Sequence, residues 1–173
     1  ALAGGGTIDY GIIPPASLNK DTFTVLDEKQ VDFSITCDAP AKVGVHAIGS
    51  KADTSTDSSG ASSGYRVFKG TLFGGLSHAN VDGLGKTDEG KNIGGYGIRL
   101  DPSAFTVDGN KADLIARSEL VDGWKPALKM DRGSFYKVDN KETYALSWAK
   151  PGTLEPIALK TVAGKLGVQA YIT

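Results

Sequence analysis

The regular alternation of apolar and polar residues over Val31–Cys37 constrains the fold of this chain more than any other stretch. Its sequence, VDFSITC, places an apolar side chain at every second position. Successive side chains of a β-strand point to opposite faces, so the pattern predicts a strand with one buried and one solvated face. The Asp38-Ala39-Pro40 that follows is predicted to end this strand, because proline cannot donate a hydrogen bond to a sheet ladder.

Similar short stretches recur along the chain with turn residues between them, and no stretch has the 3.6-residue period of a helix. The 23 glycines suit many strands joined by many turns. We therefore predict one all-β domain over residues 1–173, an immunoglobulin-like sandwich of two sheets. Thr22–Leu26 is predicted to be a short extended piece. Lys42–Ile48 is predicted to pair with Val31–Cys37, and Ala104–Val107 with Ala112–Ala116 in a hairpin about Asp108-Gly109-Asn110. The other predicted strands are Thr7–Ile13, Tyr65–Phe68, Thr71–Leu76, Gly95–Leu100, one beginning at Phe135, Thr143–Trp148, Pro156–Val162 and Leu166–Ile172.

The charge and hydropathy of the chain argue against two classes of protein. The formal net charge is -1 and the pI is near 6.1, whereas binding to nucleic acid requires a basic face. No apolar run approaches the roughly 18 residues of a membrane-spanning helix. We therefore expect no nucleic-acid partner and no transmembrane helix.

The sequence offers little chemistry for catalysis or for metal binding. His46 and His78 are far apart, and no His, Cys and Asp spacing resembles a metal site. The acidic stretch Asp82–Glu89 lacks the residue order of a calcium-binding loop. We predict no catalytic, cofactor-binding or metal-binding residues, and hence no enzyme. A carbohydrate hydrolase that uses exposed carboxylates is the enzymatic alternative.

Several motifs occur in an order that resembles one known family. They are TIDYG at 7–11, FSITCDAP at 33–40, IGGYGIRL at 93–100, YALSWAKPG at 144–152 and EPIALKTVAGKLGVQAYI at 155–172. Together they resemble a fimbrial-like, or pilin-like, family of unknown function that is associated with bacterial chaperone–usher pili. The resemblance covers most of the chain and is weakest over residues 50–92.

The resemblance implies a structural or adhesive subunit of a fimbria, which passes through the periplasm to the cell surface. Such pilins have an incomplete immunoglobulin-like fold, whose groove is filled first by a strand of a periplasmic chaperone and then by the next subunit, at an outer-membrane usher. Strand addition of this kind uses backbone hydrogen bonds for affinity and alternate side chains for register. The groove candidates are Val31, Phe33, Ile35, Leu166, Val168 and Ile172, each of which could instead be a plain core residue.

The resemblance also changes the interpretation of Cys37, the only cysteine of the chain. Read alone, Cys37 is a small core residue. The family pairs the cysteine of its TCD motif with one near its start, which implies that Cys37 is half of a disulfide. The family also tends to end with a further apolar strand after a segment like VQAYI, which here is followed by Thr173. The resemblance therefore implies a native chain that extends upstream of Ala1 and beyond Thr173, or else a divergent member of the family.

The second function that the sequence leaves open is a carbohydrate-binding, lectin-like module. It would bind a host or surface glycan through the polar loops at residues 50–65 and 77–92. A tip adhesin would combine both functions.

Overall fold

The computed structural model describes residues 6–20, 24–45, 82–100, 104–118, 121–126, 134–136 and 145–172. Within these ranges the protein is all-β, as its alternating patterns predict. A 3₁₀ turn, η2 (Pro15–Ser17), precedes the first strand. In this part of the chain, no helix has the length and apolar character needed to cross a membrane. The strands are β1 (Thr24–Val25), β2 (Lys29–Ala41), β3 (Asp82–Gly83), β4 (Gly94–Leu100), β5 (Thr106–Val107), β6 (Asn110–Lys111), β7 (Asp113–Ser118), β8 (Val121–Pro126), β9 (Ser134–Tyr136), β10 (Ala145–Ala149) and β11 (Leu159–Ile172).

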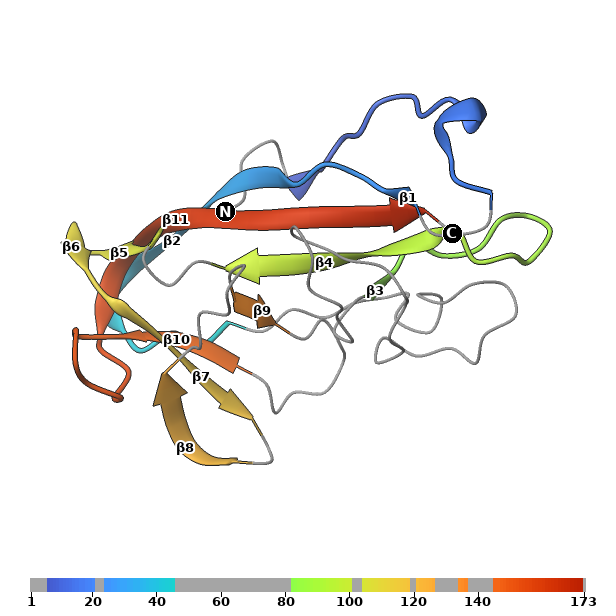
Figure 1. Ribbon diagram of the computed structural model, residues 1–173. Helices are drawn as coiled ribbons and strands as arrows, with labels where there is room; N and C mark the ends of the chain where they lie inside the picture. Colours follow the sequence, from blue (N-terminus) through green and yellow to red (C-terminus); the bar gives the residue numbers. More distant parts are fainter. Residues whose placement is uncertain are drawn as a thin grey trace.

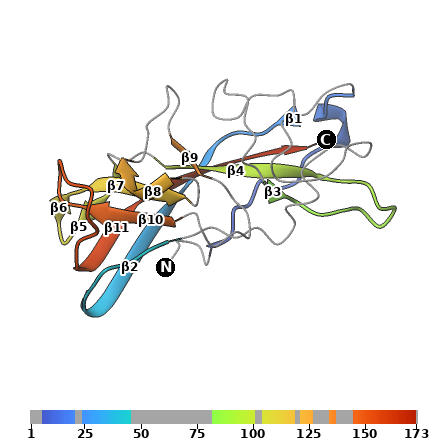
Figure 2. The ribbon, with the colours of Figure 1, turned by 90° about the horizontal axis from the view of Figure 1, so that it is seen from below.

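The strands form two open sheets (Figure 1). The larger sheet has the order β3-β4-β11-β5-β6, with β1 and β2 also paired to β11 and β9 paired to β4. The smaller sheet has the order β10-β7-β8. It lies at the end of the larger sheet where β5 and β6 are found, and Figure 2 shows this arrangement from below.

Strand β11 is the centre of the larger sheet because it pairs along both of its edges. One edge pairs with β2 and then with β1, and the other pairs with β5 and then with β4, all antiparallel. The sequence predicted two strands here, Pro156–Val162 and Leu166–Ile172, and this prediction is wrong. The intervening Ala163, Gly164 and Lys165 pair with β2 and continue a single strand.

The hydrophobic core lies between the two sheets and gives the fold its sandwich-like character. Phe33 of β2 meets Phe105, which precedes β5, edge to face with ring centroids 6.2 Å apart. Phe33 also stacks on Trp148 of β10 at 6.2 Å. Leu146 and Trp148, which belong to the strand predicted at Thr143–Trp148, are both buried in this core. The other buried members of this cluster are Val107, Ala112, Leu114, Leu159 and Val162.

Strand β2 confirms the alternation predicted for Val31–Cys37. Val31 is buried, the next three apolar residues are half-buried, and the polar residues between them are exposed. The predicted end at Asp38-Ala39-Pro40 is wrong, because β2 continues to Ala41.

A bulge explains why proline does not end β2. The ladder with β11 passes from the pair Thr36–Thr161 to the pair Ala41–Leu159, so that residues 37–40 of β2 face Lys160 alone. Pro40 therefore lies within the bulge, where no ladder bond requires its missing N–H.

Two further strand predictions are corrected by the structure. Thr7–Ile13 forms no strand. The described part of Lys42–Ile48 does not pair with β2, because Val45 instead forms an isolated bridge with Leu146 of β10. The Ser147 hydroxyl also donates to the Val43 carbonyl oxygen at 2.7 Å. The chain therefore crosses from the larger sheet to the smaller one at this point.

The later predictions hold in part. The predicted strand at 95–100 is confirmed as β4, and the predicted hairpin turn at Asp108-Gly109 is confirmed between β5 and β6. The returning strand of that hairpin is β6 and not Ala112–Ala116, most of which belongs to β7 of the smaller sheet. The predicted strands Tyr65–Phe68 and Thr71–Leu76, together with His46 and His78, lie outside the described residues.

Gly164 allows β11 to pass close to the core. It pairs with Phe33, and a Cβ atom at this position would collide with the Phe105 ring and lie 2.9 Å from the Ala104 carbonyl oxygen. Glycine within a strand often marks such a close approach.

We expect Gly164→Ala to lower the free energy of unfolding by about 1–3 kcal/mol, because the added methyl group overpacks the core. Chemical denaturation would measure this change, and Ala163→Ser at the exposed neighbouring position is the control. The smaller side chain of Phe105→Leu should offset part of the loss in the double variant. A stability of Gly164→Ala equal to that of the wild type would contradict the close packing.

Asp108 fastens the β5–β6 hairpin to β11. Asp108 and Gly109 both have positive φ, 50° and 80°, as a two-residue hairpin turn requires. The Asp108 carboxylate accepts hydrogen bonds from the N–H groups of Thr161 and Lys160 at 2.9 and 3.1 Å, and from the Thr161 hydroxyl at 3.2 Å. The bond from the Thr161 N–H is the main reason that the pKa of Asp108 lies below its usual value.

The lowered pKa of Asp108 predicts a loss of stability in acid. The contribution of this carboxylate is complete above the usual aspartate pKa and is lost as the pH falls through the lower folded-state pKa. Asp108→Asn keeps an acceptor oxygen but does not titrate. The gap in Tm between wild type and Asp108→Asn should therefore narrow between about pH 5 and pH 2. A gap that stays constant over this range would rule out the role of the charge.

Candidate functional site

The residues predicted to line a strand-accepting groove share one face of the larger sheet. Val31 and Leu166 are register partners in the β2–β11 ladder. Phe33 and Ile35 of β2, together with Leu166, are half-buried and pack against the core cluster. Along these residues β2 and β11 pair directly with one another. The full set, now located, is Val31, Phe33 and Ile35 on β2 and Leu166, Val168 and Ile172 on β11.

The side of β2 that faces away from β11, here called the outer edge, is at the border of the sheet. Among the described strands, β11 is the only one that pairs with β2. The Ala170 carbonyl oxygen accepts a hydrogen bond from the Leu26 N–H at 2.9 Å, so the backbone of Ala170 faces β1 and β2.

Backbone groups alternate in direction along a strand, so every second residue of β11 before Ala170 also faces β2. On β2, the register partners of those residues direct their backbone N–H and C=O groups toward β11. The β2 residues between those partners direct theirs away from β11, to the outer edge. These outward-facing residues are Gln30, Asp32, Ser34 and Thr36.

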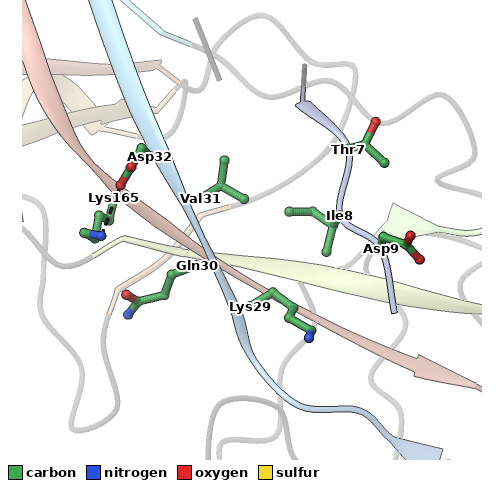
Figure 3. Close-up of a pocket in the computed structure, with 8 residues that line it drawn as sticks. All are labelled: Thr7, Ile8, Asp9, Lys29, Gln30, Val31, Asp32 and Lys165. Carbon is green, nitrogen blue, oxygen red and sulfur yellow. Dashed lines mark ion pairs between the residues drawn. The ribbon is translucent and has the colours of Figure 1, made fainter. Parts of the chain in front are cut away.

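A depression of about 340 Å³ lies between the N-terminal segment and β2 (Figure 3). It is open to solvent, and Lys165 Nζ and Asp32 Oδ1 form an ion pair 3.1 Å apart at its rim. Both of these side chains are more than half exposed, so the ion pair contributes about 1 kcal/mol at most. In Figure 3, Ile8 lies beside the backbone of β2 at Val31. The lining residues are Thr7, Ile8, Asp9, Lys29, Gln30, Val31, Asp32 and Lys165.

Tyr10 joins the N-terminal segment to the larger sheet. Its hydroxyl donates a hydrogen bond to the Asp27 carbonyl oxygen at 2.8 Å and accepts one from the Ala170 N–H at 3.2 Å. The Lys29 ammonium lies 5.7 Å from the centre of the Tyr10 ring, within the range of a cation–π contact. Tyr10 thus bridges the N-terminal segment, the end of β2 and β11.

The sequence did not reveal this role of Tyr10, because Tyr10 fits the alternation of the strand predicted at Thr7–Ile13. The residues next to Tyr10 did contain a sequence signal against a strand. The Asp9 carboxylate accepts a hydrogen bond from the Gly11 N–H at 2.7 Å, and Gly11 has a φ of 67°. Asp and Gly at this spacing are typical of a local turn, which would have argued against a strand.

Cys37 is a free thiol, half-buried and packed against the core cluster. The disulfide implied by the family resemblance therefore stays a prediction. In the described residues, no group of three or more His, Cys, Asp or Glu side chains is arranged to hold a metal ion.

The fold and this site define an all-β protein of two open sheets with a long strand at the border of the larger sheet. The chain belongs to the family described as "Protein of unknown function (DUF1120)", whose model matches residues 1–97. It is also similar to the "Uncharacterized protein YhcF" of Escherichia coli (strain K12), with 27% identity over 180 residues, 99% of this chain and 74% of the relative. No solved structure matches the chain at a significant level.

The environment of Tyr10 predicts a loss of stability in alkali. Burial raises the pKa of Tyr10, and the nearby charges of Asp27 and Glu28 raise it further, against the opposing effect of the hydrogen bond from Ala170. Because the folded state favours the neutral phenol, its contribution is complete below the usual tyrosine pKa and is lost as the pH rises through the folded-state pKa.

Tyr10→Phe removes this titration and leaves the other tyrosines unchanged. Above about pH 10, we expect the free energy of unfolding to fall more steeply for the wild type than for Tyr10→Phe. Urea denaturation at several alkaline pH values would measure the two slopes. Equal slopes would show that the Tyr10 hydroxyl titrates as it does in the unfolded chain.

Proposed function

We propose that this protein is a structural or adhesive subunit of a bacterial surface fibre, and that its larger sheet accepts an added strand from a neighbouring subunit. The observation that carries the proposal is β2, a 13-residue strand whose outer edge borders the sheet. The outward-facing N–H and C=O groups of Gln30, Asp32 and Thr36 on this edge are backbone donors and acceptors for an incoming chain. The order of the fimbrial-like motifs in the sequence supports the same conclusion.

The side chains of β2 suit an added strand. Phe33, Ile35 and Cys37 contact the core cluster and yet remain half-exposed. An extended segment along the outer edge would place its own alternate apolar side chains beside them and would cover part of the exposed surface. Each square ångström of apolar surface removed from water contributes about 25 cal/mol, and the backbone ladder would fix the register.

In this proposal the two sheets form an immunoglobulin-like sandwich that the added strand completes. A periplasmic chaperone would supply the strand during transit, and the adjacent subunit would supply it in the fibre at the outer-membrane usher. Covering the outer edge would also prevent the edge-to-edge aggregation to which long exposed strands are prone.

Binding of a short synthetic peptide with alternating valine and threonine tests the proposal. We expect the peptide to form a complex and to raise Tm, because a ligand that binds only the folded state stabilises it. Thr36→Pro should abolish binding, because it removes an outward-facing N–H while leaving the bonds between β2 and β11 in place. Thr36→Val, which keeps the N–H and a β-branched side chain, is the matched control.

Calorimetric titration and thermal denaturation would give the two readouts. The proposal fails if the wild-type protein forms no complex and its Tm does not change. It also fails if the Thr36→Pro variant is folded and binds the peptide as well as Thr36→Val, because the peptide would then bind elsewhere.

A further inference from the structure

The N-terminal segment at residues 6–13, here called the strap, lies beside β2 without forming a strand. Its residues Thr7, Ile8 and Asp9 form one wall of the depression in Figure 3, and Lys29–Asp32 of β2 form the other. Further along, the strap turns at Gly11, and the Ile12 side chain is 96% exposed. The strap therefore lies against the Lys29–Asp32 end of the edge along which an added strand would extend.

Tyr10 fastens the strap at an irregularity in the sheet. The pairs Val25–Tyr171 and Lys29–Val168 enclose three residues of the β1–β2 connection, 26–28, but only two residues of β11, 169 and 170. A regular ladder cannot continue through this mismatch. One backbone bond remains, from the Leu26 N–H to the Ala170 carbonyl oxygen, and two side chains supply further bonds. The Tyr10 hydroxyl bonds the Ala170 N–H and the Asp27 carbonyl oxygen, and Gln169 Nε2 donates to the Leu26 carbonyl oxygen at 2.7 Å.

The two side chains differ in what they connect. Gln169 belongs to β11, so its hydrogen bond stays within the sheet. Tyr10 belongs to the strap, so its hydrogen bonds tie a segment without ladder pairing of its own to the sheet. Release of the strap therefore requires these bonds to break and leaves the strands in place.

We propose that the strap is displaceable, and that Tyr10 controls how far an incoming strand can extend along the outer edge of β2. The inference rests on the proposed function, since it concerns the same edge. The incoming chain is an extended segment with alternating apolar residues. With Tyr10 fastened, such a segment reaches the part of β2 around Thr36, and with Tyr10 released it also covers Lys29–Asp32.

Tyr10→Phe tests the proposal because it removes the hydroxyl and keeps the ring. In the free protein, amide hydrogen exchange should become about fivefold to tenfold faster at Ala170, the effect expected from the loss of one hydrogen bond. The valine–threonine peptide should bind Tyr10→Phe several-fold faster than it binds the wild type. Ile12→Ala, at an exposed position of the same strap, is the control and should change neither quantity.

The possible outcomes test the role of the strap and the proposed function separately. If exchange at Ala170 is the same in wild type and Tyr10→Phe, the hydroxyl does not hold the strap and the inference is wrong. If exchange becomes faster but the peptide binds both proteins at the same rate, the strap does not control the edge. If the peptide binds neither protein, the proposed function itself is overturned. Faster exchange together with faster binding, absent in Ile12→Ala, would support the inference.

Discussion

The pairing of β11 along both of its edges is the constraint on which the rest of the structure depends. The backbone groups of a strand cannot be left unpaired in a protein interior, and β11 satisfies its groups only if β2, β1, β5 and β4 all reach it. Irregularities in the larger sheet follow from this requirement. The bulge at residues 37–40 and the mismatch at 26–28 each adapt a neighbouring segment to one long, continuous strand, and Gly164 within β11 allows that strand to pass close to the core.

The sequence predicted the local features of this fold well, because the alternation of side chains is a local property. Val31–Cys37, residues 95–100 and the turn at Asp108-Gly109 all have patterns that depend on a few adjacent residues. Features set by distant contacts were missed. Pro40 does not end its strand because β2 bulges there, with residues 37–40 facing Lys160 of β11 alone. Gly164 continues β11 because the Phe105 ring occupies the space that a side chain would fill.

The features of the candidate site also fall into those that a local pattern predicted and those that distant contacts determine. The apolar face of β2 and β11 could be predicted from periodicity, and the structure brings those residues together. The outer edge of β2 and the contacts of Tyr10 depend on which strands pair and on a mismatch between two ladders. No pattern within the chain encodes those relations, although the turn of Asp9 and Gly11 was a local sign that the first predicted strand was wrong.

The position of β11 in the chain has a consequence for how the protein is made. Among the described strands, β2 pairs only with β11, and most of the chain separates the two in sequence. A ribosome therefore produces β2 long before its partner exists, and the alternating apolar residues of β2 stay uncovered during that interval. Contacts between distant segments also form slowly, and uncovered strands aggregate readily. The nascent chain thus has its greatest need for a holding protein before β11 emerges.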